Sequence, residues 1–381
     1  MFFAPPYTAI ERRSIYLVIY SLTHIHLLDL NVCGLRFDRI YVNAGRGYMK
    51  SRRSILKWLV GFTTGVLLTK QANAQGGNGQ NSDAQSDRLG KLLPQRILGR
   101  TGEAVTMLGA GGWHLGAMSE RDAQETIEIA LQSGVRFFDT AESYQSGGSE
   151  KRMGKLLTPK YRDVIYLMTK STAKNADDAR RHLEGSLRRL NTDYLDLWQV
   201  HSLTTPEDTE SRIAEGVFEV MAEAKASGKV RHVGFTGHYQ PAALLRAMES
   251  DLFDACQMPV NLADPSYSSF IDRVMPKLVE QNIGVLAMKS LANGGFFGGS
   301  AHGQHGDNPK VVPNRVSIAE AINFTWSLPI SVLITGADNP AQMQEKIDLA
   351  NSFVTMDEAQ RQALIDRVAD LAGRQVEFYK A

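Results

Sequence analysis

The sequence predicts an α/β protein with a single catalytic domain, a (β/α)8 TIM barrel over residues 94–381. Two observations predict this fold. Eight short apolar segments alternate with segments whose apolar residues have helical spacing, which is typical of βαβ units that form a parallel sheet. The eight repeats also fit within about 250–280 residues, the usual length of a closed barrel of this kind.

The elements follow one another regularly from residue 96. Strands are predicted at the short apolar runs 105–109, 135–140, 163–169, 194–200, 230–236, 255–260, 283–288 and 332–335. Helices are predicted at 121–133, 151–157, 177–190, 213–227, 241–248, 270–281, 318–327 and 341–351, with one more from residue 358. The helix at 241–248 opens with Pro241, whose fixed backbone angle suits the first position of a helix.

A doubly wound open sheet is the alternative architecture. The segment 109–114, after the first strand, reads Gly-Ala-Gly-Gly-Trp-His and partly matches the dinucleotide-binding pattern of such sheets. However, His114 takes the place of the third glycine, and no helix is predicted to start there. We therefore expect the closed barrel.

Composition excludes several classes of protein. The 381 residues are 43% hydrophobic, and 42 basic residues nearly balance 41 acidic ones, for a net charge of +1. This balance argues against a strongly basic nucleic-acid-binding protein and against a polybasic membrane-surface protein. The two cysteines, Cys33 and Cys256, are too few for a disulfide scaffold or for a cysteine-based zinc or iron–sulfur site.

Residues 49–74 resemble a twin-arginine signal peptide. Arg52 and Arg53 precede a short apolar run at 58–69 and an Ala-Asn-Ala cleavage pattern that ends at Ala74. The run is too short to cross the ~30 Å core of a bilayer, so no stable membrane span is expected. The resemblance implies the twin-arginine export machinery as a partner and a periplasmic or exported protein, or a cytoplasmic one if the signal is not used.

The segments on either side of this signal are not expected to belong to the barrel. We expect Met49 to be the true start and residues 1–48 to be a doubtful N-terminal extension; the alternative is a disordered leader. Residues 75–93 are rich in Gly, Asn, Gln, Ser and Asp, which is typical of a flexible linker.

Polar residues interrupt or follow three consecutive predicted strands. Asp139 ends the second strand and Tyr144 follows it, Lys170 ends the third, and His201 ends the fourth. Because the carboxyl ends of barrel strands converge on one mouth, we expect these four side chains to meet. Taken singly, each has a structural interpretation as a cap, a rim residue or a solvated strand end, but their joint placement favours a site.

These four residue types can together reduce a carbonyl group. An ion pair with Asp139 would keep Lys170 charged, and the ammonium is expected to lower the pKa of Tyr144 from its usual ~10. Tyr144 can then protonate the alkoxide as it forms, while His201 orients the carbonyl oxygen. No residue supplies electrons, so a nicotinamide cofactor must provide hydride.

Two other functions are left open. A metal-dependent barrel hydrolase could use His201, His238, Lys170 and Asp338, although the first strand lacks the HxH pair that such barrels usually carry. A non-catalytic nicotinamide-binding barrel is the other alternative. Dinucleotide binding with turnover of an aldehyde or quinone would distinguish the reductase from both.

Residues 96–351 resemble the aldo-keto reductase superfamily. The motifs that carry this resemblance lie at 137–144, 149–154, 167–170, 193–201 and 228–234. The resemblance implies a small-molecule carbonyl substrate, Tyr144 as proton donor, Lys170 and Asp139 as the residues that tune it, and His201 as the residue that orients the carbonyl. Trp113 and His114 are expected in the substrate pocket. Neither the particular carbonyl compound nor the oligomeric state is predicted.

The resemblance also implies a cofactor site, with NADP(H) as the first choice and NAD(H) as the alternative. The cofactor-binding residues are expected to be Thr236, Gln257, Met288, Lys289, Leu291, Gly336, Gln342, Glu345 and Lys346. Gly336 and Gln342 stand where the family often has Lys and Arg for a 2′-phosphate, Lys346 can offer a point charge instead, and Asp338 would repel that phosphate. The glycine-rich loop 293–308 is expected near the pyrophosphate.

Overall fold

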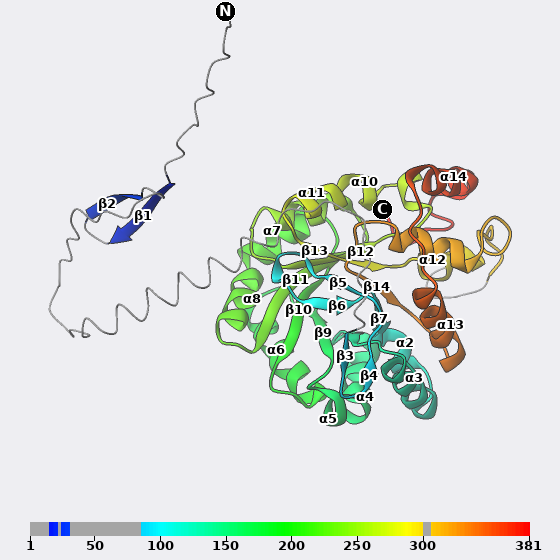
Figure 1. Ribbon diagram of the computed structural model, residues 1–381, viewed down its shortest axis with the longest axis horizontal. Helices are drawn as coiled ribbons and strands as arrows, with labels where there is room; N and C mark the ends of the chain where they lie inside the picture. Colours follow the sequence, from blue (N-terminus) through cyan, green and yellow to red (C-terminus); the bar gives the residue numbers. More distant parts are fainter. Residues whose placement is uncertain (1–14, 22–23, 31–84, 300–305) are drawn as a thin grey trace, which may run out of the picture. The chain divides into compact units, whose positions relative to one another are not determined.

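The computed structural model describes residues 15–21, 24–30, 85–299 and 306–381 (Figure 1). The chain divides into two units, Met1–Gln80 and Asn81–Ala381. In the first unit, β1 (Ile15–Ser21) pairs antiparallel with β2 (His24–Leu30), in a segment where the sequence showed no strand period. The predicted signal peptide at 49–74 lies outside the described residues.

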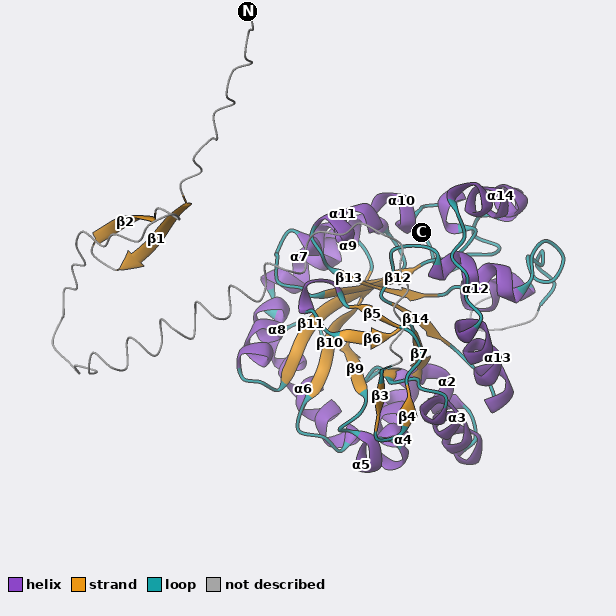
Figure 2. Ribbon diagram, viewed as in Figure 1, coloured by secondary structure: helices purple, strands orange, loops and turns teal. Residues whose placement is uncertain are grey.

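The second unit is a closed barrel of eight parallel strands, which confirms the predicted fold class (Figures 1 and 2). Each strand pairs with the next in chain order, and the last pairs with the first. The strands are β7 (Leu108–Gly111), β8 (Phe137–Asp139), β9 (Tyr166–Ser171), β10 (Leu195–Leu203), β11 (Val230–Gly237), β12 (Ala255–Pro259), β13 (Gly284–Met288) and β14 (Val332–Thr335).

Helices surround this barrel, as Figure 2 shows. They are α2 (Gly112–Ala117), α3 (Glu120–Gln132), α4 (Gly148–Leu156), α5 (Thr158–Tyr161), α6 (Ala176–Leu190), α7 (Pro206–Ala214), α8 (Val217–Ala226), α9 (Pro241–Met248), α10 (Phe270–Arg273), α11 (Met275–Glu280), α12 (Ile318–Trp326), α13 (Pro340–Asn351) and α14 (Glu358–Val368). Several begin at a side chain that accepts a backbone N–H of the first turn, such as Ser119, Asn175 and Asp357.

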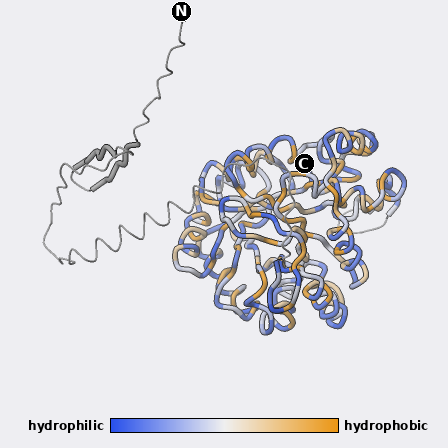
Figure 3. Tube along the Cα trace, in the orientation of Figure 1, coloured by the Kyte–Doolittle hydropathy of each residue, from blue (hydrophilic) through white to orange (hydrophobic). Residues whose placement is uncertain are grey.

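Apolar side chains fill both faces of the strands. Phe137, Met168 and Leu197 belong to the cluster inside the barrel, whereas their neighbours Phe138 and Leu167 pack in the layer between strands and helices. Figure 3 accordingly shows hydrophobic segments in the strands and a mixture of hydrophobic and hydrophilic residues along the helices. This alternation with a period of two decides which residues near a strand end point into the barrel.

Some predicted element boundaries were wrong. The helix predicted at 213–227 contains α8 and only the last two residues of α7, most of which was not predicted; Gly216, with a φ of 77°, separates the two helices. The helix predicted at 270–281 is likewise divided into α10 and α11, and Pro276 lies in the first turn of α11. A helix also begins directly after the first barrel strand, at Gly112, where none was expected.

The first predicted strand, at 105–109, overlaps two strands with different partners. β6 (Ala104–Thr106) pairs antiparallel with β5 (Gln95–Ile97), whereas β7 belongs to the barrel. Leu98 and Val105, from this hairpin, join the interior cluster, and Arg100 N–H donates to the carbonyl of Asn282 just before β13. The hairpin therefore covers the amino-terminal end of the barrel.

The flexible linker predicted at 75–93 is wrong for residues 85–93, the part that the structure describes. These residues contain a second hairpin, β3 (Ser86–Asp87) and β4 (Gly90–Lys91), and Leu93 is buried. Asp87 contacts the buried Arg136 guanidinium at 2.6 Å. A buried cation requires such a partner, and composition alone did not show it.

Within the described residues, no helix combines the length and apolar character needed to cross a bilayer.

Candidate active site

The polar strand-end residues gather at the carboxyl-terminal mouth of the barrel. Asp139 follows the interior residue Phe137 by two positions, and Lys170 follows Met168 by two, so that both side chains point inward above the apolar core. Together with Tyr144 and His201 they line one cavity of about 800 Å³. The structure thus brings together the four residues that the sequence singled out.

Lys170 is the centre of this group. Its ammonium lies 2.5 Å from Asp139 Oδ1 and donates to the carbonyl of Thr140 at 2.9 Å and to the Tyr144 hydroxyl oxygen at 3.1 Å. Lys170 is only 1% exposed and Asp139 only 3% exposed. A buried ion pair with further hydrogen bonds holds its atoms in a defined geometry, so the Tyr144 hydroxyl has a fixed neighbour.

The predicted lowering of the Tyr144 pKa is wrong. Burial raises the pKa of Tyr144 above its usual value, and the nearby charge of Lys170 opposes this effect without outweighing it. The negative charge of Asp139 adds to the increase. The prediction considered the ammonium and omitted desolvation, which depends on the three-dimensional surroundings. The consequence is a phenol that keeps its proton at neutral pH.

Burial also affects the pKa values of Lys170 and His201. Burial lowers the pKa of Lys170, but Asp139 and Tyr144 more than compensate, so its pKa is raised overall and it remains an ammonium. Burial, followed by the charge of Lys170, holds the pKa of His201 well below its usual value. A neutral imidazole therefore lies next to Tyr144, with ring centroids 5.7 Å apart, and its Nδ1 is 3.4 Å from Ser143 Oγ.

The cavity also contains a buried polar atom without a partner. Gln257 is 2% exposed, and its Oε1 has no hydrogen-bond partner among the described residues. Thr236, on the neighbouring strand, accepts the N–H of Ser202 at 3.0 Å, so its hydroxyl hydrogen is available to donate. A carboxamide both donates and accepts hydrogen bonds, so this pair fits the amide of a nicotinamide ring.

In the part of the cavity that we expect to hold the adenosine, the charged side chains are paired with one another. A Cβ at Gly336 would lie 2.1 Å from the His114 ring, so the glycine is required for close packing. The Lys346 ammonium contacts the Glu345 carboxylate and is 5% exposed, so its charge is already compensated. Asp338 Oδ1 is 3.7 Å from His114 Nε2. Gln342 is committed locally, because its side chain accepts the backbone N–H of Asp338.

The remaining predicted residues line the same cavity, together with residues that the sequence did not suggest. Trp113, Met288, Lys289 and Leu291 are in the lining. Phe378 and Tyr379, from the last residues of the chain, were missed. No periodic pattern in the sequence indicates that this C-terminal segment reaches the site. Its only signal is an aromatic pair that lies between two charged residues. His302 and His305 of the glycine-rich loop lie outside the described residues.

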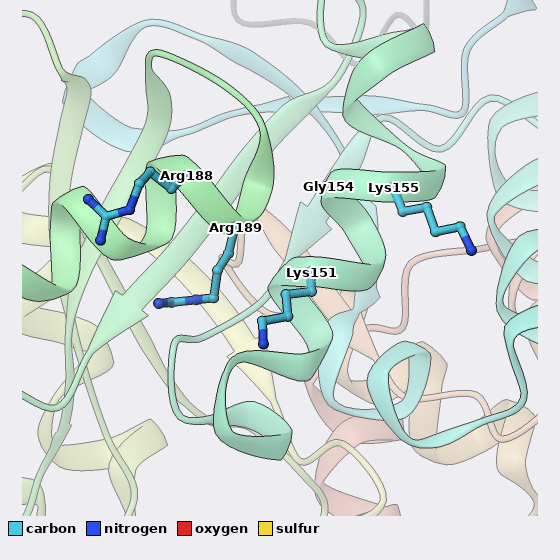
Figure 4. A pocket seen from close by; sticks show the side chains of 5 residues that line it. All are labelled: Lys151, Gly154, Lys155, Arg188 and Arg189. Carbon is cyan, nitrogen blue, oxygen red and sulfur yellow. The ribbon is translucent and has the colours of Figure 1, made fainter.

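A smaller cleft of about 350 Å³ lies between α4 and α6 and is lined by Lys151, Gly154, Lys155, Arg188 and Arg189 (Figure 4). Lys155 pairs with Glu120, and Arg189 pairs with the buried Glu150. None of the strand-end residues reaches it. Among the described residues, no three His, Cys, Asp or Glu side chains gather as a metal site would require.

The fold and the site define a class of protein: a TIM barrel with a buried lysine–aspartate pair beside a tyrosine hydroxyl at its carboxyl-terminal mouth. A comparison with known families then identifies the particular one. The model of the aldo/keto reductase family matches residues 107–365. The chain belongs to the aldo/keto reductase family.

Curated relatives agree with this assignment. The chain is 32% identical over 218 residues to aldo-keto reductase YhdN of Bacillus subtilis, a match that covers 51% of this chain and 61% of that relative. It is 30% identical over 235 residues to the uncharacterized oxidoreductase YrpG of the same organism, covering 54% and 68%. The chain thus spans about three fifths of the length of the first of these relatives.

Solved structures share the fold. The aldo-keto reductase AKR11C1 of Bacillus halodurans superimposes with a TM-score of 0.61 at 22% identity, covering 72% of this chain and 96% of that one. An aldo-keto reductase of Klebsiella pneumoniae in complex with NADPH gives a TM-score of 0.56 at 23% identity, covering 75% and 98%. At these identities the likeness concerns the barrel itself.

Proposed function

We propose that this protein is an NAD(P)H-dependent oxidoreductase that reduces an aldehyde or ketone to an alcohol, or catalyses the reverse reaction, with Tyr144 as general acid. The observation that carries the proposal is the Tyr144 hydroxyl oxygen 3.1 Å from the buried Lys170 ammonium, beside a neutral His201. Family membership supports the same chemistry. The particular carbonyl substrate is a small molecule that fits beside Trp113 and His114.

Each residue has a defined part in the reaction. A nicotinamide held through its carboxamide by Thr236 and Gln257 would supply the hydride that the carbonyl carbon accepts. His201 donates a hydrogen bond to the carbonyl oxygen from its neutral ring and so fixes its position. Tyr144 transfers its proton to the same oxygen as negative charge develops there, which typically accelerates such a step by about 10²–10⁴-fold. Lys170 then stabilises the phenolate, and Asp139 keeps Lys170 protonated.

We propose NADP(H) as the cofactor and retain NAD(H) as the second candidate. The resemblance to the aldo/keto reductase family favours NADP(H), and the aldo-keto reductase of Klebsiella pneumoniae was solved in complex with NADPH. Asp338 and the pairing of Lys346 with Glu345 favour NAD(H). A 2′-phosphate would meet the Asp338 carboxylate there, and the Lys346 charge is already compensated. Thr236 and Gln257 are assigned to the carboxamide. Met288, Lys289, Leu291, Gly336, Gln342, Glu345 and Lys346 are assigned to the rest of the dinucleotide.

The test is to titrate the purified protein with NADPH and with NADH while following nucleotide fluorescence. Turnover is then measured with a panel of aldehydes, ketones and quinones. The proposal requires micromolar or tighter binding of at least one nucleotide and its oxidation by a carbonyl compound. Binding without any turnover favours the non-catalytic barrel. Binding of zinc without either nucleotide favours the metal-dependent hydrolase.

We further propose that the twin-arginine segment exports the protein to the periplasm with its cofactor already bound. This export route carries folded proteins, and Cys256, the only cysteine after residue 74, is buried, so folding before export needs no intramolecular disulfide. Replacing Arg52 and Arg53 together by lysine should leave the protein in the cytoplasm, as fractionation of cells would detect. Recovery of the unaltered protein from the cytoplasm alone would exclude export. Recovery of periplasmic protein with no bound nucleotide would exclude transport of the holoenzyme.

A further inference from the structure

β10 is irregular at the point where it carries His201. Its register with β11 shifts between Val200 and Leu203, where three steps along β10 face two steps along β11. Leu197 packs inside the barrel and Leu203 in the outer layer between strands and helices, although an unbroken alternation would place both on the same face. One extra residue is therefore inserted into the strand, as in a β-bulge, and such bulges often re-aim a side chain beside an active site.

The backbone of this bulge has a conformation that needs support. Ser202 has a φ of 56°, in the left-handed region that residues other than glycine rarely adopt. Its N–H donates to the Thr236 hydroxyl oxygen of β11 at 3.0 Å. The carbonyls of Ser202 and His201 accept hydrogen bonds from the guanidinium of Arg212 at 3.2 and 3.0 Å. Such a backbone persists only where the surrounding structure holds it.

Arg212 reaches the bulge from α7 through the interior of the protein. Its side chain is only 2% exposed, and it also donates to the carbonyl of Ala173, just after β9, at 3.5 Å. Asp208, one turn earlier in α7, accepts from it at 3.2 and 3.1 Å. Burial raises the pKa of Asp208, but hydrogen bonds from Arg212 and Lys174 outweigh burial and lower the pKa overall. The guanidinium therefore joins an ionised carboxylate to the ends of β9 and β10.

A guanidinium suits this position better than an ammonium does. It offers five N–H donors in fixed directions, whereas an ammonium offers three donors from one atom. Here the donors of Arg212 serve both carboxylate oxygens of Asp208 and three backbone carbonyls. Arg212 is not among the described residues that line the cavity. Its hydrogen bonds hold the protein itself and not a ligand.

We propose that Arg212 is a positioning residue for His201, an inference that rests on the proposed function. Its guanidinium holds the bulge of β10, and the bulge fixes the place of the imidazole beside Tyr144, where it orients the carbonyl oxygen. Arg212 acts only through His201 and touches neither the substrate nor the cofactor. A shift of about 1 Å in a catalytic geometry can lower a rate by about 10²-fold, so a residue outside the cavity can control turnover in this way.

The charge of Arg212 adds to this effect. Burial is the main cause of the low pKa of His201, and the charges of Lys170, His238 and Arg212 lower it further, while Glu142 opposes them. Loss of Arg212 removes one of these cations and loosens the buried ring, and both changes favour the imidazolium. The pKa of His201 should therefore rise. The titratable or charged groups that face the ring are Lys170, Glu142, His238, Arg212 and Tyr144.

The experiment replaces Arg212 by methionine, which keeps an unbranched side chain without the charge, and by lysine, which keeps the charge without the planar fork. Arg136→Met is the matched control, because Arg136 is a buried arginine that pairs with Asp87 and donates to two backbone carbonyls far from the cavity. kcat/KM is measured with butanal or, if butanal is not reduced, with the most active compound of the carbonyl panel. Nucleotide Kd and melting temperature are measured for each variant.

We expect Arg212→Met to lower kcat/KM at least about tenfold and Arg212→Lys to lower it at least about threefold. The nucleotide Kd should change less than about threefold, because Thr236 is held in place by β11 itself. Both methionine variants should melt earlier than the unaltered protein, since each leaves a carboxylate without its guanidinium. Only the Arg212 variants should lose turnover. A kcat/KM within twofold of the unaltered value in Arg212→Met, or in Arg212→Lys if the methionine variant does not fold, would overturn the inference.

A double-mutant cycle tests whether Arg212 acts through His201. In a His201→Ala background the ring is absent, so adding Arg212→Met, or Arg212→Lys where only the lysine variant folds, should change kcat/KM by less than about twofold. A loss in this background as large as that in the unaltered protein would show that Arg212 does not act through the ring. That result would also overturn the inference, because it assigns Arg212 a general structural role.

The His201 ring gives a further readout that needs no turnover. An NMR titration, with the ring signal assigned by its loss in His201→Ala, should show a higher pKa in Arg212→Met and an unchanged pKa in Arg136→Met. If the unaltered protein binds nucleotide but reduces no carbonyl, the proposed function fails, and the titration still decides whether Arg212 holds the ring. If turnover is normal and neither kcat/KM nor the His201 pKa depends on Arg212, the positioning role fails and the reductase assignment stands.

Discussion

The two ends of the barrel use their polar groups in opposite ways. At the amino-terminal end, the buried Asp196 contacts Arg162 at 2.8 Å, Arg231 at 2.9 Å and the N–H of Leu167 at 2.9 Å. At the carboxyl-terminal end, Gln257 Oε1 has no hydrogen-bond partner among the described residues, and no carboxylate of these residues lies within 4.0 Å of the Lys289 ammonium. The first end compensates its charges internally, whereas the second leaves groups available to ligands.

The backbone shows the same contrast. The hairpin β5–β6 closes the amino-terminal end so tightly that a Cβ at Gly99 would lie 2.3 Å from the nitrogen of Gly284. The other end holds an open cavity of about 800 Å³. Because catalysis needs space and unsatisfied polar groups, whereas stability needs neither, mutations at the two ends should separate activity from folding.

The largest expected effect is on activity, from Tyr144→Phe. This change removes the hydroxyl that contacts Lys170 and leaves the ring in place. If Tyr144 is the general acid, kcat should fall by about 10²–10⁴-fold, while nucleotide affinity and the melting temperature change little. Steady-state kinetics, fluorescence titration and thermal melting measure the three quantities. Retention of more than a tenth of kcat would remove Tyr144 from the proposed mechanism.

The next largest effect is on stability, from Asp196→Ala at the opposite end. Two guanidinium groups and one backbone N–H would lose their common acceptor. Loss of one partner of a buried ion pair costs about 3–5 kcal/mol, and we expect about 2–3 here because Arg231 is partly exposed. Denaturant unfolding measures the loss. The kcat of the folded fraction should stay the same; a large fall in kcat would show that the two ends are coupled.

The sequence was sufficient to predict the barrel and the four strand-end residues, because both depend on local pattern. Apolar runs with a period of two place Asp139 and Lys170 on the interior face whatever the details of packing. Tyr379 could not be predicted, because its position depends on Lys380 pairing with Asp264, which lies 116 residues earlier in the chain. The predicted direction of the Tyr144 pKa shift was wrong for a related reason, because desolvation is a property of the assembled site.

A smaller effect is expected in acid. Burial raises the pKa of Asp254, at the amino-terminal end, but the nearby His232 ring and hydrogen bonds from Lys225 and the N–H of Val233 lower it to about 2 overall. Because the folded pKa lies below the unfolded value of 3.8, this stabilisation is complete above about pH 4 and is lost as pH falls through about 2. Asp254→Asn should remove about 1 kcal/mol at pH 7 and flatten the melting temperature between pH 5 and pH 2.

At the carboxyl-terminal end, the change that corresponds to Asp254→Asn is Glu142→Gln. Hydrogen bonds from His182 and Thr172 outweigh burial and lower the pKa of Glu142 to about 2, so its acid profile should resemble that of Asp254. Glu142 lies two residues before Tyr144 and accepts the N–H of Thr172 at 2.7 Å, so its carboxylate holds the segment that carries Tyr144 beside the end of β9. Glu142→Gln should therefore also lower kcat/KM at pH 7, whereas Asp254→Asn should not. Equal kcat/KM values for the two variants would contradict the division between the ends.

The smallest expected effect comes from Tyr166→Phe, which makes the same chemical change as Tyr144→Phe at the other end of the barrel. Tyr166 is stacked on Phe137 with ring centroids 5.0 Å apart, and its buried hydroxyl has no hydrogen-bond partner among the described residues. Removing an unsatisfied buried hydroxyl loses no hydrogen bond, so the free energy of unfolding should change by less than about 0.5 kcal/mol. Activity should be unchanged. Should Tyr166→Phe slow turnover as Tyr144→Phe does, the loss would follow from removing any interior hydroxyl and not from the contact with Lys170.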